Sequence, residues 1–174
     1  MRQNSTTEPT TVACCYQSVR AKFPISTYCF GICYFEVRFH SPSGAAIGLS
    51  TKKMAMEEEL CVGEDKGTFA YDSEGTFWGN AIEGCQRDAK GRPFVGGKPK
   101  FGVGDTVGCG VHLATRTIFY TKNGHRLDNG DLFVNDNLDL FPAVTLLNPH
   151  NSLAARFAPK FEFDIATVTG HDEV

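Results

Sequence analysis

The fold class of this chain is decided by residues 102–124, Gly-Val-Gly-Asp-Thr-Val-Gly-Cys-Gly-Val-His-Leu-Ala-Thr-Arg-Thr-Ile-Phe-Tyr-Thr-Lys-Asn-Gly. In its first half, larger apolar side chains alternate with small or polar ones, the period of a half-buried strand: Val107, Cys109, Val111 and Leu113. Residues 117–122 add β-branched and aromatic side chains, and Asn123-Gly124 is the dipeptide that best tolerates a tight hairpin turn. The stretch therefore predicts two antiparallel strands.

Short β-type segments separated by Gly, Pro, Asn and Asp continue along the rest of the chain. Residues 34–39 and 45–50 are predicted to form a second hairpin around residues 41–44, with Glu36 and Arg38 facing solvent. Further strands are expected at 141–147, 152–157 and 161–165. No convincing amphipathic helix is present in the pattern. Repeated short strands of this kind predict an all-β fold, an antiparallel β-sandwich of two packed sheets with little helix.

Two segments depart from the strand pattern. Residues 52–60 fit either a helical turn or two, or a solvated connecting loop at a sandwich edge, because their apolar spacing is weak. Residues 127–140 are rich in Asp and Asn, so we expect a long loop with a short strand at 132–134. The length of 174 residues suits one domain. We place it at 11–168, between a flexible N-terminal lead (1–10) and a flexible C-terminal tail (169–174).

Charge and hydropathy argue against two classes of partner. Charged residues are 21% of the chain and the formal net charge is -3 at pH 7, so no basic field attracts nucleic acid or an anionic membrane surface. The apolar runs are far shorter than the roughly 20 residues of a membrane-spanning helix, and residues 1–5 lack the hydrophobic segment of a secretory signal. We expect a soluble monomer. A secreted precursor from which a signal peptide has been removed is also compatible with this sequence.

The cysteines and histidines do not form a recognisable reactive set. Seven cysteines are an odd number without the spacing of a disulfide scaffold, so we expect free thiols and a reducing cytoplasm. Cys29 and Cys33 lack the second pair that a zinc site needs. None of the five histidines stands in a motif with a nucleophile and an orienting acid. The Gly-x-Gly pairs lack a helix to receive phosphate. We therefore expect no enzyme activity, no metal and no cofactor.

Several motifs in order along the chain resemble the SPRY domain, most closely that of the Ran-binding proteins of the microtubule-organising centre type. They are Ser18-Val19-Arg20-Ala21 with Pro24-Ile25, Gly31 to Val37, Ile47-Gly48-Leu49-Ser50, Asp65-Lys66, Tyr71, Glu74-Gly75, Gly104 to Cys109, Phe119 to Gly124, and Phe141-Pro142-Ala143-Val144. The resemblance covers about residues 18–165. It implies a concanavalin-like jelly roll that serves as a non-catalytic protein-interaction domain.

The chain also departs from that group. Only a short Ser/Thr-rich lead precedes Val12, where the group usually has one or two strands with a tryptophan, and Glu64 stands where a tryptophan is common. Residues 81–99 are longer and richer in Gly and Lys than expected. This pattern is also similar to SPRY effectors that plant-parasitic nematodes secrete into host cells. An effector acting on or recognised by host proteins, and an intracellular Ran-binding-like scaffold or ligase adaptor, both stay open.

The resemblance implies a shallow peptide pocket built by three loops: the one before strand 18–20, the Tyr71 segment, and the turn after strand 143–145. The implied partner-binding residues are Cys14, Cys15, Tyr16, Tyr71, Asp72, Leu147, Asn148 and Pro149. Tyr71 would offer a ring and a hydroxyl, and Pro149 would stiffen the rim. Tyr71 and Trp78 also fit core aromatic positions, and Arg20 could brace the framework through a carboxylate. The expected partner is a protein or peptide, with host immune and ubiquitin-pathway proteins as candidates.

Overall fold

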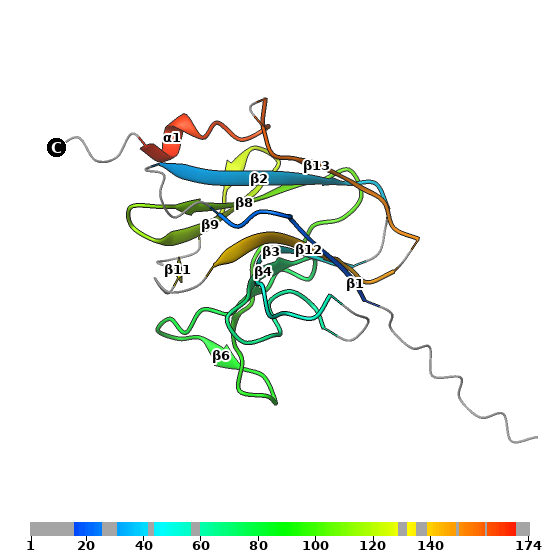
Figure 1. Cartoon of the computed structure of the whole chain (residues 1–174), viewed down its shortest axis with the longest axis vertical. Coiled ribbons are helices and arrows are strands. Elements are labelled where there is room, and N and C mark those ends of the chain that lie inside the picture. Colours follow the sequence, from blue (N-terminus) through cyan, green and yellow to red (C-terminus); the bar gives the residue numbers. More distant parts are fainter. Residues whose placement is uncertain are drawn as a thin grey trace, which may run out of the picture.

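The computed structural model describes residues 16–25, 31–41, 44–56, 60–128, 132–134, 139–148, 150–158 and 160–169. Within them, β-strands dominate and helix is confined to one turn (Figure 1). The elements are β1 (Gln17–Arg20), β2 (Ile32–Phe39), β3 (Ala45–Thr51), β4 (Phe69–Asp72), β5 (Phe77–Trp78), β6 (Gln86–Arg87), β7 (Pro93–Val95), β8 (Thr106–His112), β9 (Thr117–Lys122), β10 (His125–Arg126), β11 (Leu132–Phe133), β12 (Leu140–Leu146), β13 (Leu153–Arg156) and α1 (Ala166–Thr169).

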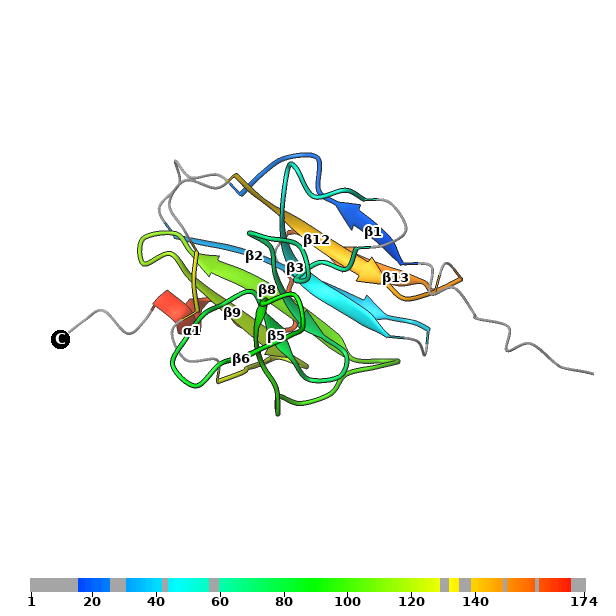
Figure 2. The same ribbon diagram turned by 90° about the horizontal axis from the view of Figure 1, so that it is seen from below.

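The strands form two antiparallel sheets that lie as two layers (Figure 1). Sheet A has the order β1-β12-β3-β4-β5-β7-β6, and sheet B has the order β10-β9-β8-β2-β13, with β11 pairing to β9. Figure 2 shows the same sandwich after a quarter turn, with the strands of the two layers running obliquely across the molecule. The predicted all-β sandwich is therefore confirmed, and so is the short strand expected near residue 132.

The core lies between the two sheets and is built from the alternate positions that the sequence pattern identified. Strand β2 contributes Phe35, Val37 and Phe39, and the opposed β3 contributes Ile47 and Leu49. The remaining core side chains include Tyr71, Phe77, Phe101, Val107, Cys109, Val111, Ile118, Tyr120 and Val144. The predicted pair of β8 and β9 is present, joined by residues 113–116. The Asn123-Gly124 turn joins β9 to the short β10, with positive φ values of 48° and 75°.

The predicted hairpin of residues 34–39 and 45–50 is wrong. Strand β2 pairs with β8 and β13 in sheet B, whereas β3 pairs with β4 and β12 in sheet A. The connection between them therefore crosses from one layer to the other. The same is true of β12 and β13, which follow each other in the chain but lie in different sheets. Alternation of apolar and polar residues shows that a strand has a buried face. The pattern does not distinguish a next strand that pairs in the same sheet from one that packs in the opposite sheet.

The strand predicted at residues 161–165 is also wrong. This segment runs without regular structure into α1, and it covers the outer face of sheet B near β2 (Figure 1). Phe163 is buried against Tyr34 and Phe119, with Phe161 edge-on to the Tyr34 ring. The cover makes Glu36 a buried residue with 2% of its surface exposed, not the solvated one expected. Burial also raises the pKa of the Tyr34 hydroxyl.

A short ladder of hydrogen bonds holds Glu36 under this cover. Its carboxylate accepts from the Arg156 guanidinium at 2.6 Å and from the backbone N–H of Glu162, which lies 3.0 Å from both oxygens. Tyr34 donates its hydroxyl to the same carboxylate at 3.3 Å. A buried carboxylate is tolerated only when it is paired and hydrogen-bonded in this way. Glu36 therefore ties the C-terminal segment to sheet B.

The glycines of β8 have a structural role rather than a phosphate-binding one. A Cβ atom at Gly110 would overlap the Phe119 ring, and one at Gly108 would overlap the Tyr34 hydroxyl. Bare backbone at these two positions lets the aromatic side chains lie across the sheet, where the C-terminal segment then packs. This close approach is the reason why only glycine fits.

Candidate functional site

A shallow pocket of about 170 Å³ lies where the ends of several sheet A strands meet the loop that follows β3. We call it the sheet A pocket. Its lining comes from segments far apart in the sequence: Tyr16, Ala45, Cys61, Val62, Glu64, Asp72, Ser73, Glu74, Trp78 and Leu147. Loops gathered at the end of a rigid sheet are where binding chemistry commonly lies. The pocket is therefore the candidate binding site.

Asp72 organises one wall of the pocket. One carboxylate oxygen accepts from the indole N–H of Trp78 at 2.8 Å, and the other accepts from the backbone N–H of Thr76 at 2.9 Å. Ser73 extends this wall, because its hydroxyl accepts from the backbone N–H of Ala45 and its own N–H donates to the Ala45 carbonyl. The β4–β5 turn is thus fixed to β3, and Trp78 presents its indole in a defined orientation.

The opposite wall comes from residues 60–64, which are pinned to the sheet by side chains. Thr145 accepts from the backbone N–H of Val62 at 2.9 Å, while the Arg92 guanidinium donates to the Gly63 carbonyl at 2.7 Å and to the Thr68 carbonyl at 2.8 Å. Arg92 is partly buried, and desolvation lowers its pKa despite the nearby Asp65. A preorganised wall reduces the entropy lost on binding.

The charge of the pocket is negative. Its titratable lining groups include three carboxylates, Glu64, Asp72 and Glu74, and no lysine or arginine. Asp72 is occupied by Trp78, and Glu74 forms an exposed ion pair with Lys100 at 2.6 Å. The Glu64 carboxylate has no hydrogen-bonding or ion-pair partner among the described residues, although the backbone N–H of Glu64 donates to the Cys61 carbonyl at 3.0 Å. The rim is therefore suited to a ligand that brings a positive charge or hydrogen-bond donors.

Cys61 lines the pocket but is a poor nucleophile. Burial, together with the nearby Glu64 carboxylate, raises the pKa of its thiol to about 12. The thiolate is the reactive form of cysteine, so this thiol is almost wholly protonated at neutral pH. Cys61 contributes an apolar surface to the pocket rather than covalent chemistry.

Three of the predicted site residues meet in this pocket, namely Tyr16, Asp72 and Leu147. Tyr71 does not: it is 0% exposed, its ring packs on Phe77, Phe101 and Tyr120, and its hydroxyl donates to the Pro99 carbonyl. The expectation that its ring faces a ligand is wrong, and its position is that of a core aromatic. Burial raises the pKa of this hydroxyl as well.

Other predicted positions lie elsewhere or outside the described residues. Asn148 is exposed and accepts from the backbone N–H of His150 at 3.0 Å, and it does not line the pocket. Cys14, Cys15 and Pro149 fall outside the described residues. Arg20 braces the framework, but through carbonyls rather than the carboxylate expected: it donates to the Thr51 carbonyl at 2.7 Å and lies over the Phe141 ring.

Sequence reasoning did not assign seven of the lining residues to the site, and it noted Glu64 only as a departure from a family pattern. The seven are Ala45, Cys61, Val62, Glu64, Ser73, Glu74 and Trp78. The single tryptophan of the chain could have signalled the site, because an indole beside Asp72 at a strand end is a frequent binding surface. In the part of the chain that the structure describes, no three His, Cys, Asp or Glu side chains are grouped to hold a metal ion. A search of the same residues finds no helix long and apolar enough to cross a membrane.

Comparison with known proteins identifies relatives of the chain. The family model of the SPRY domain matches residues 32–159. The chain is 38% identical over 152 residues to Ran-binding protein 10 of Danio rerio and to Ran-binding protein 9 of Homo sapiens, and each match covers 85% of this chain. It spans 23% and 19% of the length of these two relatives, respectively. The crystal structure of a human SPRY domain superposes with a TM-score of 0.61 at 21% identity, covering 84% of this chain and 87% of that one.

Proposed function

The chain belongs to the SPRY domain family, and on this premise we propose that it binds an extended segment of a partner protein in the sheet A pocket. The observation that carries the proposal is the meeting of Tyr16, Trp78 and Leu147 around an acidic rim. Aromatic rings give apolar contact area with a polar edge, and the rim carboxylates favour donors on the ligand. The family and its Ran-binding relatives fit a protein-interaction domain.

We propose a ligand with at least one basic or amide side chain. Glu64 is the carboxylate of the rim that no described residue neutralises, so a lysine, arginine or asparagine of the ligand would find an acceptor there. The apolar part of the ligand would lie on Trp78 and Leu147. The pocket is small, so two or three ligand residues would occupy it.

We propose that this interaction takes place in a reducing cytoplasm. Cys61, Cys85 and Cys109 are free thiols and no disulfide forms among the described residues, which is compatible with such a compartment. No residue of the pocket favours the secreted-effector interpretation over an intracellular adaptor, so both remain predictions about the same site.

Selection of peptides from a random displayed library tests the proposal. We expect the unmodified chain to enrich peptides that contain lysine, arginine or asparagine next to an apolar residue. The charge reversal Glu64→Lys should weaken the selected peptides by about tenfold, since it replaces an attraction with a repulsion. Glu83→Lys is the matched control, because Glu83 is an exposed carboxylate that does not line the pocket.

The truncation Leu147→Ala should also weaken binding, and a thermal melt of each variant checks that it is folded. Enrichment of no peptide, or equal binding by the unmodified, Glu64→Lys and Leu147→Ala chains, would contradict the sheet A pocket as the binding site.

A further inference from the structure

Strand β13 leaves one edge of sheet B open. It pairs with β2, and no described strand lies on its other side. The direction of its backbone groups follows from the register. His40 donates its N–H to the Ser152 carbonyl, whereas the N–H of Phe39 points the other way, to Asp105. Along an antiparallel strand, successive residues direct their N–H and C=O groups to opposite sides. Leu153 and Ala155 therefore direct theirs to the open edge.

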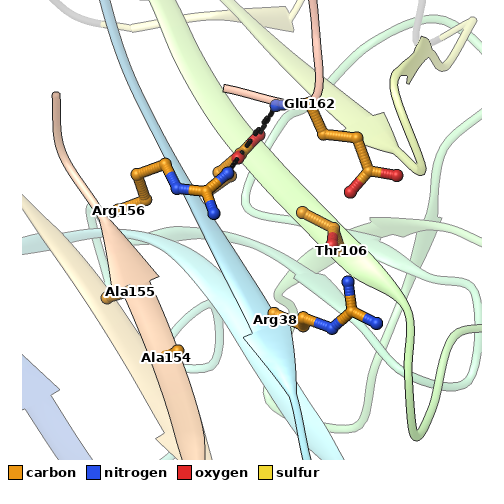
Figure 3. Close-up of a pocket in the computed structure, with 7 residues that line it drawn as sticks. Arg38, Thr106, Ala154, Ala155, Arg156 and Glu162 are labelled. Atoms are coloured by element: carbon orange, nitrogen blue, oxygen red, sulfur yellow. Dashed lines mark hydrogen bonds and ion pairs between the residues drawn. The ribbon is translucent and has the colours of Figure 1, made fainter. Parts of the chain in front are cut away.

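The outer face beside this edge is hollowed by a second pocket, of about 260 Å³, which we call the sheet B pocket (Figure 3). It is lined by Glu36, Arg38, Thr106, Ala154, Ala155, Arg156 and Glu162. The register sets Ala154 beside Arg38 and Arg156 beside Glu36. Because Ala154 has only a methyl group, it leaves the space between the open edge and Arg38 unfilled.

Two guanidinium groups face this hollow. The Arg38 side chain is exposed, and its guanidinium forms no ion pair or hydrogen bond with a described residue. Arg156 is paired with Glu36, yet 53% of its side chain is exposed. The carboxylate of Glu36 is already satisfied by Arg156 and by the backbone of Glu162. Glu162 itself lies on the far side of β2 from β13 (Figure 3). The Arg38 guanidinium extends across β2 toward Thr106, so Arg156 is the lining guanidinium next to the open edge (Figure 3).

The inner side of the same edge is apolar and incompletely covered. Ala155 is paired with the buried Val37, so it belongs to the face that packs between the sheets, and it is nevertheless exposed. Phe157, just beyond β13, stacks on the core residue Phe35 with ring centroids 5.6 Å apart and is 60% exposed. A strand with apolar side chains on its inner side would cover both.

We propose that β13 is a docking edge for an extended peptide in which acidic and apolar residues alternate. The peptide would add to sheet B as a further strand, with main-chain hydrogen bonds to Leu153 and Ala155. Its acidic side chains would lie on the outer face, one beside Arg156 and one reaching over Ala154 to Arg38, whose exposed side chain would turn from Thr106 toward β13. Its apolar side chains would lie over Ala155 and Phe157. Charge complementarity selects this occupant over a basic or neutral strand.

The reach of the side chains permits this arrangement. Neighbouring strands lie about 4.8 Å apart, so the added strand would be about 10 Å from β2. A glutamate and an arginine extending toward each other span that separation when the side chain between them is alanine, and the exposed Arg38 side chain would turn toward β13 to do so. The site is on the opposite sheet from the sheet A pocket and does not rest on the function proposed there.

A synthetic peptide is the test. We would titrate the folded chain with a fluorescently labelled, N-acetylated nine-residue peptide of alternating valine and glutamate, following anisotropy at low salt. We expect saturable binding, and binding about tenfold weaker when lysine replaces every glutamate. Amide hydrogen exchange should slow at Leu153 and Ala155 when the peptide is bound.

Two variants separate the contribution of main-chain hydrogen bonds to peptide binding from the contribution of charge. Ala155→Pro removes an N–H that points to the open edge and leaves the β2 ladder intact, so we expect binding to fall by about tenfold. Arg38→Glu should weaken the glutamate peptide about fivefold and strengthen the lysine peptide. Ala155→Val, which keeps the N–H, and Arg87→Glu, on β6 of the other sheet, are the matched controls.

The proposal is overturned if the glutamate peptide does not bind at millimolar concentration, or if the lysine peptide binds equally well. It is also overturned if the edge is already filled by a second copy of this chain, which sedimentation would show as a dimer that Ala155→Pro disrupts. Equal binding by the Ala155→Pro and Ala155→Val chains would exclude strand addition.

Discussion

The outer faces of the two sheets carry similar alternating patterns but are used differently. On sheet B, Tyr34, Glu36 and Phe119 are covered by the C-terminal segment and become a second small core with a buried carboxylate. On sheet A, the loop after β3 covers Ala46 and Ala70 through Met54 and Val62, and leaves a pocket at one end. The Glu36 carboxylate is structural under its cover, whereas the Glu64 carboxylate at the pocket is available to a ligand. The segment that covers each sheet, and not the alternation of residues along its strands, decides whether an outward-facing side chain is buried or available.

Removing the guanidinium that neutralises Glu36 should have the largest effect on stability. Arg156→Ala leaves a carboxylate that is 2% exposed without its ion-pair partner, so we expect a loss of about 3 kcal/mol in the free energy of unfolding, measured with urea. Lys100→Ala breaks the exposed pair with Glu74 and should leave the urea midpoint unchanged. Similar midpoints for both variants would show that the cover on sheet B does not depend on Glu36.

A methyl group at Gly110 should disturb the packing between the outer face of sheet B and the C-terminal segment. Gly110→Ala drives a Cβ atom into the buried Phe119 ring, and we expect a loss of about 2 kcal/mol from overpacking. Gly96→Ala is the matched control, because its added Cβ would meet no atom within 4 Å. Its stability should stay within about 0.5 kcal/mol of the unmodified chain. A tolerated Gly110→Ala would mean that the Phe119 ring can shift under its cover.

The turn that leads from sheet A into β8 should give the smallest effect, one that depends on pH. Partial burial alone would raise the pKa of Asp105, but hydrogen bonds from Asn123 and Gly102, together with Lys122, hold it below its usual value. The contribution of Asp105 to stability is then present above the unfolded-state pKa of about 3.9 and is lost as pH falls through the lower folded-state pKa.

Asp105→Asn should therefore cost about 1 kcal/mol at pH 7 and little at the lowest pH where the chain remains folded. Urea unfolding at a series of pH values measures this. A variant that is destabilised equally at all pH values would show that the geometry of the turn matters and the charge of Asp105 does not.

Much of the architecture could be predicted because it is local. The run from residue 102 to 124 specifies two strands through its alternation, and the structure pairs them side by side as β8 and β9. Its Asn-Gly dipeptide forms the next turn, between β9 and β10. The core-facing positions of β2 and β3 were also identified correctly. The three loops implied by the family resemblance contain Tyr16, Asp72 and Leu147, which do line one pocket.

The failures share one physical cause, which is that they depend on contacts between distant segments. Tyr71 was expected at the ligand, but its alternation places it toward the layer where Phe77 and Tyr120 pack. Glu36 has the outward position of a solvated residue, and only the contacts with Arg156 and with the segment of Glu162 make it buried. Alternation along a strand predicts to which face of the sheet a side chain points, but it does not predict which segment covers that face.

By itself the sequence determined that this chain is built from short antiparallel strands, which side chains of each strand face the core, and that it resembles the SPRY domain family. Only the tertiary structure decided which strands share a sheet, which outward residues are buried, and that Trp78 and Glu64 belong to the pocket. Side-chain alternation is imposed by neighbouring residues in the chain. Sheet membership and burial arise from pairings between segments tens of residues apart, which a local pattern does not encode.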